Sequence, residues 1–187
     1  SQRAPRDILS AEDLDALRAE SPTAMYHGDY AAAHSLAAKI VESGNATASD
    51  MNQAAWYALF TSHISDTDVE DALHGAQMSQ NNPHILHTLA CLYAATGKTK
   101  EAHELLIQAM DRENLDEPDP DYWFAFGRIA EQYDETQTAI ADYQRVTKPK
   151  RALQVPGSSY WLAQNRMKIL QPEAPATQVA GLGVKPN

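Results

Sequence analysis

The sequence predicts an all-α fold, an α-solenoid in which antiparallel helix hairpins stack side by side. Three observations support this prediction. Apolar residues recur with the period of a helix, and no stretch keeps the alternation of apolar and polar residues that marks a strand. Glycine is scarce, with 8 residues in a chain of 187. The helical segments are about 11 to 16 residues long and the turns about 2 to 6, which favours antiparallel neighbours.

The composition is that of an ordinary globular protein with an acidic surface. Hydrophobic residues make up 43% of the chain and charged residues 21%, enough to bury a sizeable core. The formal net charge is −10, so the chain lacks the positively charged surface that binding to nucleic acid or anionic lipid requires. No apolar run approaches the roughly 20 residues of a membrane span. We therefore expect no nucleic-acid partner and no membrane insertion.

Capping and breaking signals set the expected helix boundaries. The first helix opens at Ser10-Ala-Glu-Asp13 and should end near residue 20, because Pro22 fits the first turn of a new helix but not the interior of an old one. Thr67-Asp-Val-Glu70 has the spacing of a capping box and should open the fourth helix. The expected helices cover about residues 10–20, 30–42, 49–63, 67–79, 83–96, 99–113, 121–133, 136–147 and 158–170.

These boundaries divide the chain into four parts. We expect an N-terminal helix in residues 1–22, a repeat array in 23–157, a capping helix in 158–170 and an irregular tail in 171–187. The tail carries three prolines and no apolar face, so it should be mobile or held by a neighbour. The chain begins without Met or a signal-peptide pattern, so we expect a piece of a longer protein or a processed form, of undetermined localisation.

Two hairpins carry the same pattern of large and small residues. Small residues recur where two helices should cross, because helix axes about 8–10 Å apart leave no space there for a bulky side chain. A shift of 37 residues, from Leu86 to Trp123, brings the two patterns into register. The matched positions are Leu86, Leu89, Ala90, Tyr93, Gly97, Ala102, Leu106 and Ala109 in one hairpin, and Trp123, Phe126, Gly127, Ala130, Ala139, Tyr143 and Val146 in the other.

This pattern resembles the tetratricopeptide repeat, a family of helix hairpins with aromatic and leucine positions, a turn glycine and alanines at the crossings. An earlier unit that begins at Trp56 matches less closely, since Phe60 stands where a small residue is usual. The first unit keeps Gly28-Asp-Tyr30 and Ala33. The resemblance implies three to four repeats over about residues 24–170, closed by a capping helix, in a bacterial protein that serves as a scaffold.

Two motifs suggest nucleotide or metal chemistry, and we interpret both as structural. Gly97-Lys98-Thr99 looks like the end of a phosphate-binding loop, but that loop needs a glycine where Leu92 stands and a strand where a helix is expected. His84, His87 and Cys91 share a helix face and could bind a soft metal; a packed or wetted groove wall is the alternative that we favour. We expect no catalytic group, no metal and no cofactor.

The resemblance also implies a binding surface. Stacked hairpins curve, and the first helix of each pair lines the concave side. Aromatic and arginine side chains there are the usual anchors of protein interfaces. We therefore expect a non-catalytic protein–protein interaction module that binds a peptide or helix of a partner in this groove. The expected groove residues are Tyr57, Thr61, His84, His87, Cys91, Phe124 and Arg128.

Two other functions stay open at this stage. The segment could be an accessory or regulatory region of a larger bacterial enzyme, for example after a transglutaminase-like domain, and pack on its catalytic domain. Self-association through an uncapped end of the array is a further alternative. The sequence does not name the partner.

Overall fold

The computed structural model describes residues 9–171, and this part of the chain is all-helical. It holds nine α-helices and one 3-10 turn and contains no strand. None of the helices in residues 9–171 is both long and apolar enough to cross a membrane. The elements are α1 (Ala11–Tyr26), α2 (Tyr30–Glu42), α3 (Ala48–Ala58), α4 (Asp66–Met78), α5 (Pro83–Ala95), α6 (Thr99–Glu113), α7 (Tyr122–Gln132), α8 (Thr136–Arg145), η1 (Ala152–Gln154) and α9 (Ser159–Leu170).

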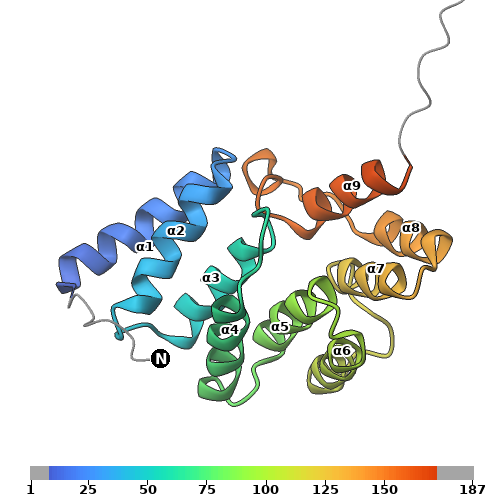
Figure 1. The fold of residues 1–187 in the computed structure, drawn as a ribbon, viewed down its shortest axis with the longest axis horizontal. Coiled ribbons are helices and arrows are strands. Elements are labelled where there is room, and N and C mark those ends of the chain that lie inside the picture. The colour runs from blue at the N-terminus through green and yellow to red at the C-terminus, as the bar shows by residue number, and fades with distance from the viewer. Residues whose placement is uncertain (1–8, 172–187) are drawn as a thin grey trace, which may run out of the picture.

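Helices that follow each other in sequence lie side by side. The most extensive contacts join α1 to α2, α3 to α4, α5 to α6 and α7 to α8, so the helices pack as consecutive pairs. Each pair then contacts the next, and α5 contacts both α3 and α7. The pairs follow one another along an arc in Figure 1. Short turns account for this arrangement, because they return each helix along its predecessor.

Capping boxes fix where three of the helices begin. Ser10 and Asp13 form one at α1, as expected from the sequence. At α4 the box is formed by Ser65 and Asp68, where the Ser65 hydroxyl accepts from the Asp68 amide at 3.2 Å. The expected start at Thr67 is therefore two residues late. A third box opens α3 from Thr47. Each box satisfies backbone amides that the first helical turn leaves unpaired.

The prediction that Pro22 ends the first helix is wrong. Helix α1 runs from Ala11 to Tyr26 with Pro22 inside it. A proline in a helix interior removes one backbone hydrogen bond and typically costs about 3 kcal/mol. Apolar burial compensates here, because Met25, three residues after the proline, is almost fully buried. Tertiary packing against α2 therefore outweighs the local breaking signal.

Small residues lie at the helix crossings, as the sequence pattern predicts. Ala90, Ala102 and Ala139 are completely buried. Gly127 lies so close to α8 that a Cβ atom built on it would lie 2.5 Å from Cε1 of the fully buried Tyr143. No side chain fits at that position without displacing the ring. The close approach of α7 to α8 therefore depends on this glycine.

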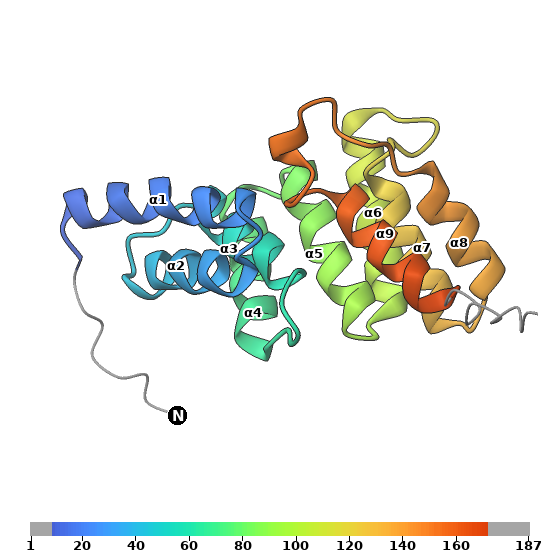
Figure 2. The same ribbon diagram turned by 90° about the horizontal axis from the view of Figure 1, so that it is seen from above.

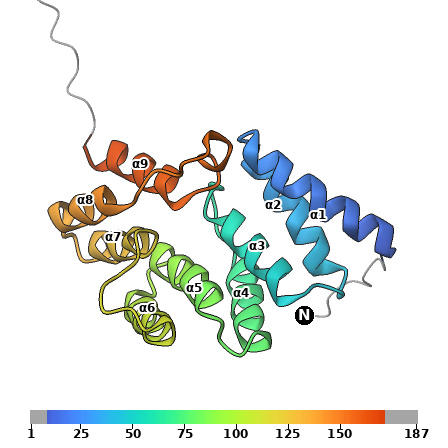
Figure 3. The same ribbon diagram turned by 180° about the vertical axis from the view of Figure 1, so that it is seen from behind.

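The C-terminal segment, residues 147–171, folds back across the array. Helix α9 packs beside α8 and α7 (Figure 2). The connection before it reaches the turn between α1 and α2, as Figure 3 shows from behind. There the Trp56 indole donates a hydrogen bond to the Gly157 carbonyl at 2.9 Å. The segment thus links the last helix pair to the first two. The predicted tail, apart from Gln171, lies outside the described residues.

Candidate binding site

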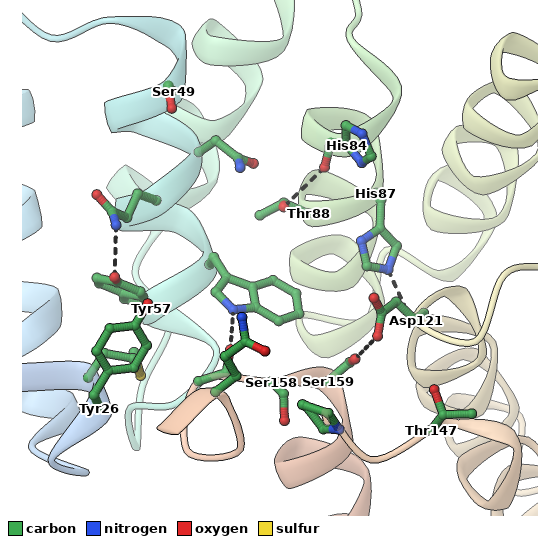
Figure 4. A pocket seen from close by; sticks show the side chains of 17 residues that line it. Tyr26, Ser49, Tyr57, His84, His87, Thr88, Asp121, Thr147, Ser158 and Ser159 are labelled. Carbon is green, nitrogen blue, oxygen red and sulfur yellow. Dashed lines mark hydrogen bonds between the residues drawn. The ribbon is translucent and has the colours of Figure 1, made fainter. Parts of the chain in front are cut away.

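Two cavities border the C-terminal segment where it crosses the inner side of the arc, one at the connection before α9 and one along α9 itself. We name the larger one, of about 720 Å³, the polar cavity (Figure 4). It is lined by Met25, Tyr26, Ser49, Asn52, Gln53, Trp56, Tyr57, His84, His87, Thr88, Asp121, Thr147, Pro149, Gln154, Gly157, Ser158 and Ser159.

We name the second one, of about 520 Å³, the basic cavity. It lies between the loop after α3 and helices α5, α7 and α9. It is lined by Leu59, Phe60, Thr61, Ser62, His63, Ile64, Ala95, Thr96, Phe124, Arg128, Trp161, Leu162, Asn165, Arg166 and Ile169.

An aromatic cluster of Tyr30, Phe60 and Trp161 lies beside these cavities. The Trp161 ring centroid is 4.6 Å from that of Tyr30 and 5.5 Å from that of Phe60. Tilted ring pairs at such distances stabilise a contact beyond the area they bury. The cluster joins α9 to α2 and to the end of α3, and so holds the C-terminal segment in place between the two cavities.

Neutral hydrogen-bonding groups dominate the wall of the polar cavity. Gln53 donates from Nε2 to the Tyr57 hydroxyl at 2.8 Å, and burial raises the pKa of Tyr57 to about 12. The Oδ1 atom of Asn52 is buried and has no hydrogen-bond partner in the described part of the chain. A buried acceptor without a partner costs about 1–3 kcal/mol. Asn52 therefore lines the cavity, and its carbonyl oxygen, buried just beneath the wall, is an acceptor that no group in residues 9–171 uses.

Asp121 is the one carboxylate among the described residues that line the polar cavity. It stands at the N-cap position of α7 but makes no capping hydrogen bond with its side chain. Its carboxylate accepts instead from the Ser159 hydroxyl, which reaches it from α9 (Figure 4). The C-terminal segment therefore orients the carboxylate toward the inner side of the array.

His87 and Cys91 form a neutral pair behind this cavity. The Nε2 atom of His87 lies 3.3 Å from the Asp121 backbone carbonyl and 3.5 Å from the Cys91 sulfur. A carbonyl accepts only from N–H, so Nε2 carries the proton. Burial lowers the pKa of His87 and raises the pKa of the Cys91 thiol well above its ordinary value. The pair is thus imidazole beside thiol, without the thiolate that a cysteine nucleophile needs.

The geometry does not favour a metal site at His84, His87 and Cys91. The His84 side chain is 82% exposed, and its Nδ1 atom lies 3.8 Å from a Glu113 carboxylate oxygen. Within residues 9–171, no three His, Cys, Asp or Glu side chains are placed to share a metal ion. His87 instead packs between aromatic rings, with centroids 4.7 Å from Tyr122 and 6.1 Å from Trp56.

Glu131 organises the charged groups behind the basic cavity. Its side chain, 8% exposed, forms ion pairs with Arg128 of its own helix and with Arg166 of α9. The Tyr143 hydroxyl donates to the same carboxylate. Burial alone would raise the pKa of Glu131, but the hydrogen bonds from Arg166 and Tyr143 outweigh burial and hold that pKa below its ordinary value. Glu131 is therefore ionised at neutral pH.

The structure separates the predicted groove residues into three groups. Tyr57, His84 and His87 line the polar cavity. Thr61, Phe124 and Arg128 line the basic cavity. Cys91 is fully buried and lines neither cavity. Phe124 is also buried, at 3% exposure, so its wall contact is small.

Several residues that line the cavities are absent from the groove predicted from the sequence. Asn52 is the polar residue one helical turn before Trp56, a spacing that could have placed it on the same face. Ser159, Trp161 and Arg166 carry no such signal, because their partners lie far away in sequence. The Trp56–Gly157 hydrogen bond, for example, joins residues 101 positions apart.

No family model, no curated protein and no solved structure matches this chain. The two cavities and the segment between them are therefore the features from which a function can be inferred.

Proposed function

We propose that this chain is a non-catalytic binding module that holds an extended segment of a partner protein in the polar cavity. The proposal includes the assignment of the helix pairs to a tetratricopeptide-like solenoid. Sequential packing of short hairpins and small residues at the crossings support that assignment. Such arrays present their first helices to ligands, and here α3 and α5 supply much of the cavity wall.

The observation that carries the proposal is the unpaired Oδ1 atom of Asn52. A bound peptide offers a backbone N–H at regular intervals, and one of them could satisfy this acceptor. No protein group in the described part of the chain pairs with this acceptor, so a peptide N–H that reaches it would displace no protein hydrogen bond.

The other groups in the wall suit a peptide backbone. Amides and hydroxyls such as those of Gln154 and Ser49 can donate or accept, so they can serve both C=O and N–H groups of an extended chain. Asp121 adds a single negative charge and favours a partner segment with a basic residue at that end. Burial lowers the pKa of His87 and raises the pKa of Cys91, so both side chains are neutral, which suits binding better than catalysis.

A peptide-display selection tests the proposal. A library of random 12-residue peptides is selected against the whole chain, and the selected peptides are titrated by calorimetry against wild type and Asn52→Ala. We expect Asn52→Ala to weaken binding about fivefold to tenfold, the size of one hydrogen bond. The matched control is Asn45→Ala, an exposed asparagine in the turn before α3, which should leave affinity unchanged.

Either of two results would overturn the proposal. One is a selection that yields no peptide with saturable binding. The other is a set of peptides whose affinity is the same for Asn52→Ala and wild type. Circular dichroism and thermal unfolding of each variant show whether a loss of binding reflects loss of the fold.

A further inference from the structure

The basic cavity is positive within an acidic protein. Arg128 of α7 and Arg166 of α9 line it, and none of the described residues in its wall carries a carboxylate. The chain as a whole has a formal net charge of −10. Glu131 neutralises one of the two guanidinium groups from behind, so the local charge remains positive by one unit.

The two arginines also have more N–H donors than Glu131 has acceptor oxygens. The Arg128 side chain is only 13% exposed, and among the described residues its one ion pair joins Nη1 to Glu131 Oε2 at 3.0 Å. Arg166 already donates from Nε and Nη2 to the same carboxylate. A guanidinium carries five N–H donors, whereas the Glu131 carboxylate has two oxygens and also accepts from Tyr143. Most donors of Arg128 therefore lack a protein acceptor.

A purely structural role would not need both arginines. One arginine from α9 suffices to tie that helix to Glu131 and to neutralise it. A second guanidinium withdrawn from water carries a desolvation cost that the shared carboxylate offsets only in part. An anion in the cavity would offset the remainder.

The aromatic side chains in the wall of the basic cavity favour an anion that is attached to an apolar group. Phe60 and Trp161 contribute aromatic surface, and Asn165 and Ser62 contribute an amide and a hydroxyl. Apolar walls lower the local dielectric constant and strengthen the attraction between a guanidinium and an anion. A volume of about 520 Å³ lies within the range of small-molecule sites.

We infer that the basic cavity is a binding site for a small organic oxyanion, a carboxylate or phosphate group on an apolar body. The oxyanion pairs with Arg128 and Arg166, and the apolar body lies against Phe60 and Trp161. This site is separate from the polar cavity and does not depend on the proposed peptide-binding function. Because Arg166 and Trp161 belong to α9, the ligand also strengthens the attachment of the C-terminal segment.

Calorimetric titration of the whole chain with benzoate and with phenyl phosphate, at constant ionic strength, tests the inference. We expect saturable binding of at least one probe, and the tighter of the two identifies the preferred oxyanion. Arg128→Gln should weaken that binding about tenfold or more, the loss typical of a desolvated charge pair. The matched control is Arg112→Gln, an exposed arginine at the end of α6 that should not change affinity.

A second variant leaves the Glu131 ion pairs intact. Asn165→Asp places a negative charge in the cavity wall and should also abolish binding of both probes. If Arg128→Gln fails to fold, Asn165→Asp decides the matter. Absence of saturable binding to wild type, or equal affinity in wild type and Asn165→Asp, would overturn the inference. Asn52→Ala should leave the affinity for these probes unchanged, which separates this site from the proposed peptide site.

Discussion

The later helix pairs, α5–α6 and α7–α8, differ from the earlier pair α3–α4 in the size of the residue at one equivalent position of the sequence pattern. Ala90 of α5 and Gly127 of α7 are small and buried at the crossings. The matching position in the earlier pair is Phe60, which lies beyond the end of α3 at Ala58. Its ring turns away from such a crossing and packs on Trp161 of α9.

This difference places the irregular part of the array where the C-terminal segment packs against it. The later pairs bury their small residues against their own partner helix. The earlier pairs use Phe60 and Tyr30 to receive the C-terminal segment. Both cavities border the region where that segment meets the array. The departure from the repeat pattern therefore lies next to the candidate binding sites.

Trp161→Ala should produce the largest effect on this comparison. Truncation removes a ring packed against Tyr30 and Phe60, and we expect a loss of about 3 kcal/mol in the free energy of unfolding, at the lower end for tryptophan because the residue is only partly buried. The C-terminal segment should detach more often. Urea denaturation measures the loss, and trypsin cleavage after Lys150 or Arg151 reports the detachment.

Trp123→Ala is the matched control for this prediction. Trp123 is also partly buried, but it packs on Phe126 and under Arg145, away from the C-terminal segment. It should lower stability without a faster cleavage after Lys150 or Arg151 in the folded protein. Equal cleavage rates in the two variants would contradict the idea that Trp161 holds the segment in place.

Local signals were sufficient for most helix boundaries. Helix α6 was expected and found at residues 99–113, and α2 at 30–42, because glycine turns and capping residues act within a few positions. Pro22 shows the limit of such signals. Its breaking tendency is local, whereas the burial of Met25 that overrides it comes from tertiary packing, which includes Gly157 far along the chain.

The candidate sites were less predictable for a related reason. The sequence pattern predicts which helices line an inner surface. Three of the expected residues line each cavity, and their contact with a partner stays a prediction. It contains no sign that α9 would cross that surface and divide it. The hydrogen bond from Ser159 to Asp121 and the ion pair from Arg166 to Glu131 span 38 and 35 positions. Contacts of that range follow from the folded arrangement of the whole array.

Glu131→Gln should have the next largest effect, because it removes the charge that holds α7 and α9 together. We expect a loss of about 2 kcal/mol at pH 7, since two partly buried arginines lose their ion pair. The pKa of Glu131 lies below its ordinary value of 4.5, so its stabilising contribution is present above that pH and is lost as pH falls. The difference from wild type should therefore shrink below about pH 4.5.

Urea denaturation at intervals of about one pH unit between pH 3 and 7 measures the difference in the free energy of unfolding between wild type and Glu131→Gln. The control is Glu135→Gln, an exposed glutamate before α8, whose effect should stay small at every pH. A destabilisation by Glu131→Gln that does not change with pH would show that shape, rather than charge, explains the role of this side chain.

A comparison of two glycine substitutions should give the smallest effect. Alanine is favoured over glycine in a helix by about 1 kcal/mol. At Gly127 the new methyl group would meet the ring of the fully buried Tyr143, so overpacking should outweigh that gain and leave a net loss of about 1–2 kcal/mol. At Gly75 of α4 the nearest atoms are Cβ of Met51, at 3.0 Å, and the Ala48 carbonyl oxygen, at 3.3 Å, so the overlap is smaller than at Gly127 and should about cancel the gain in helix propensity. Thermal unfolding should therefore show Gly75→Ala near wild type. If Gly75→Ala were the more destabilising of the two, the tightest crossing would lie in the earlier pairs, and the contrast between the two halves of the array would be reversed.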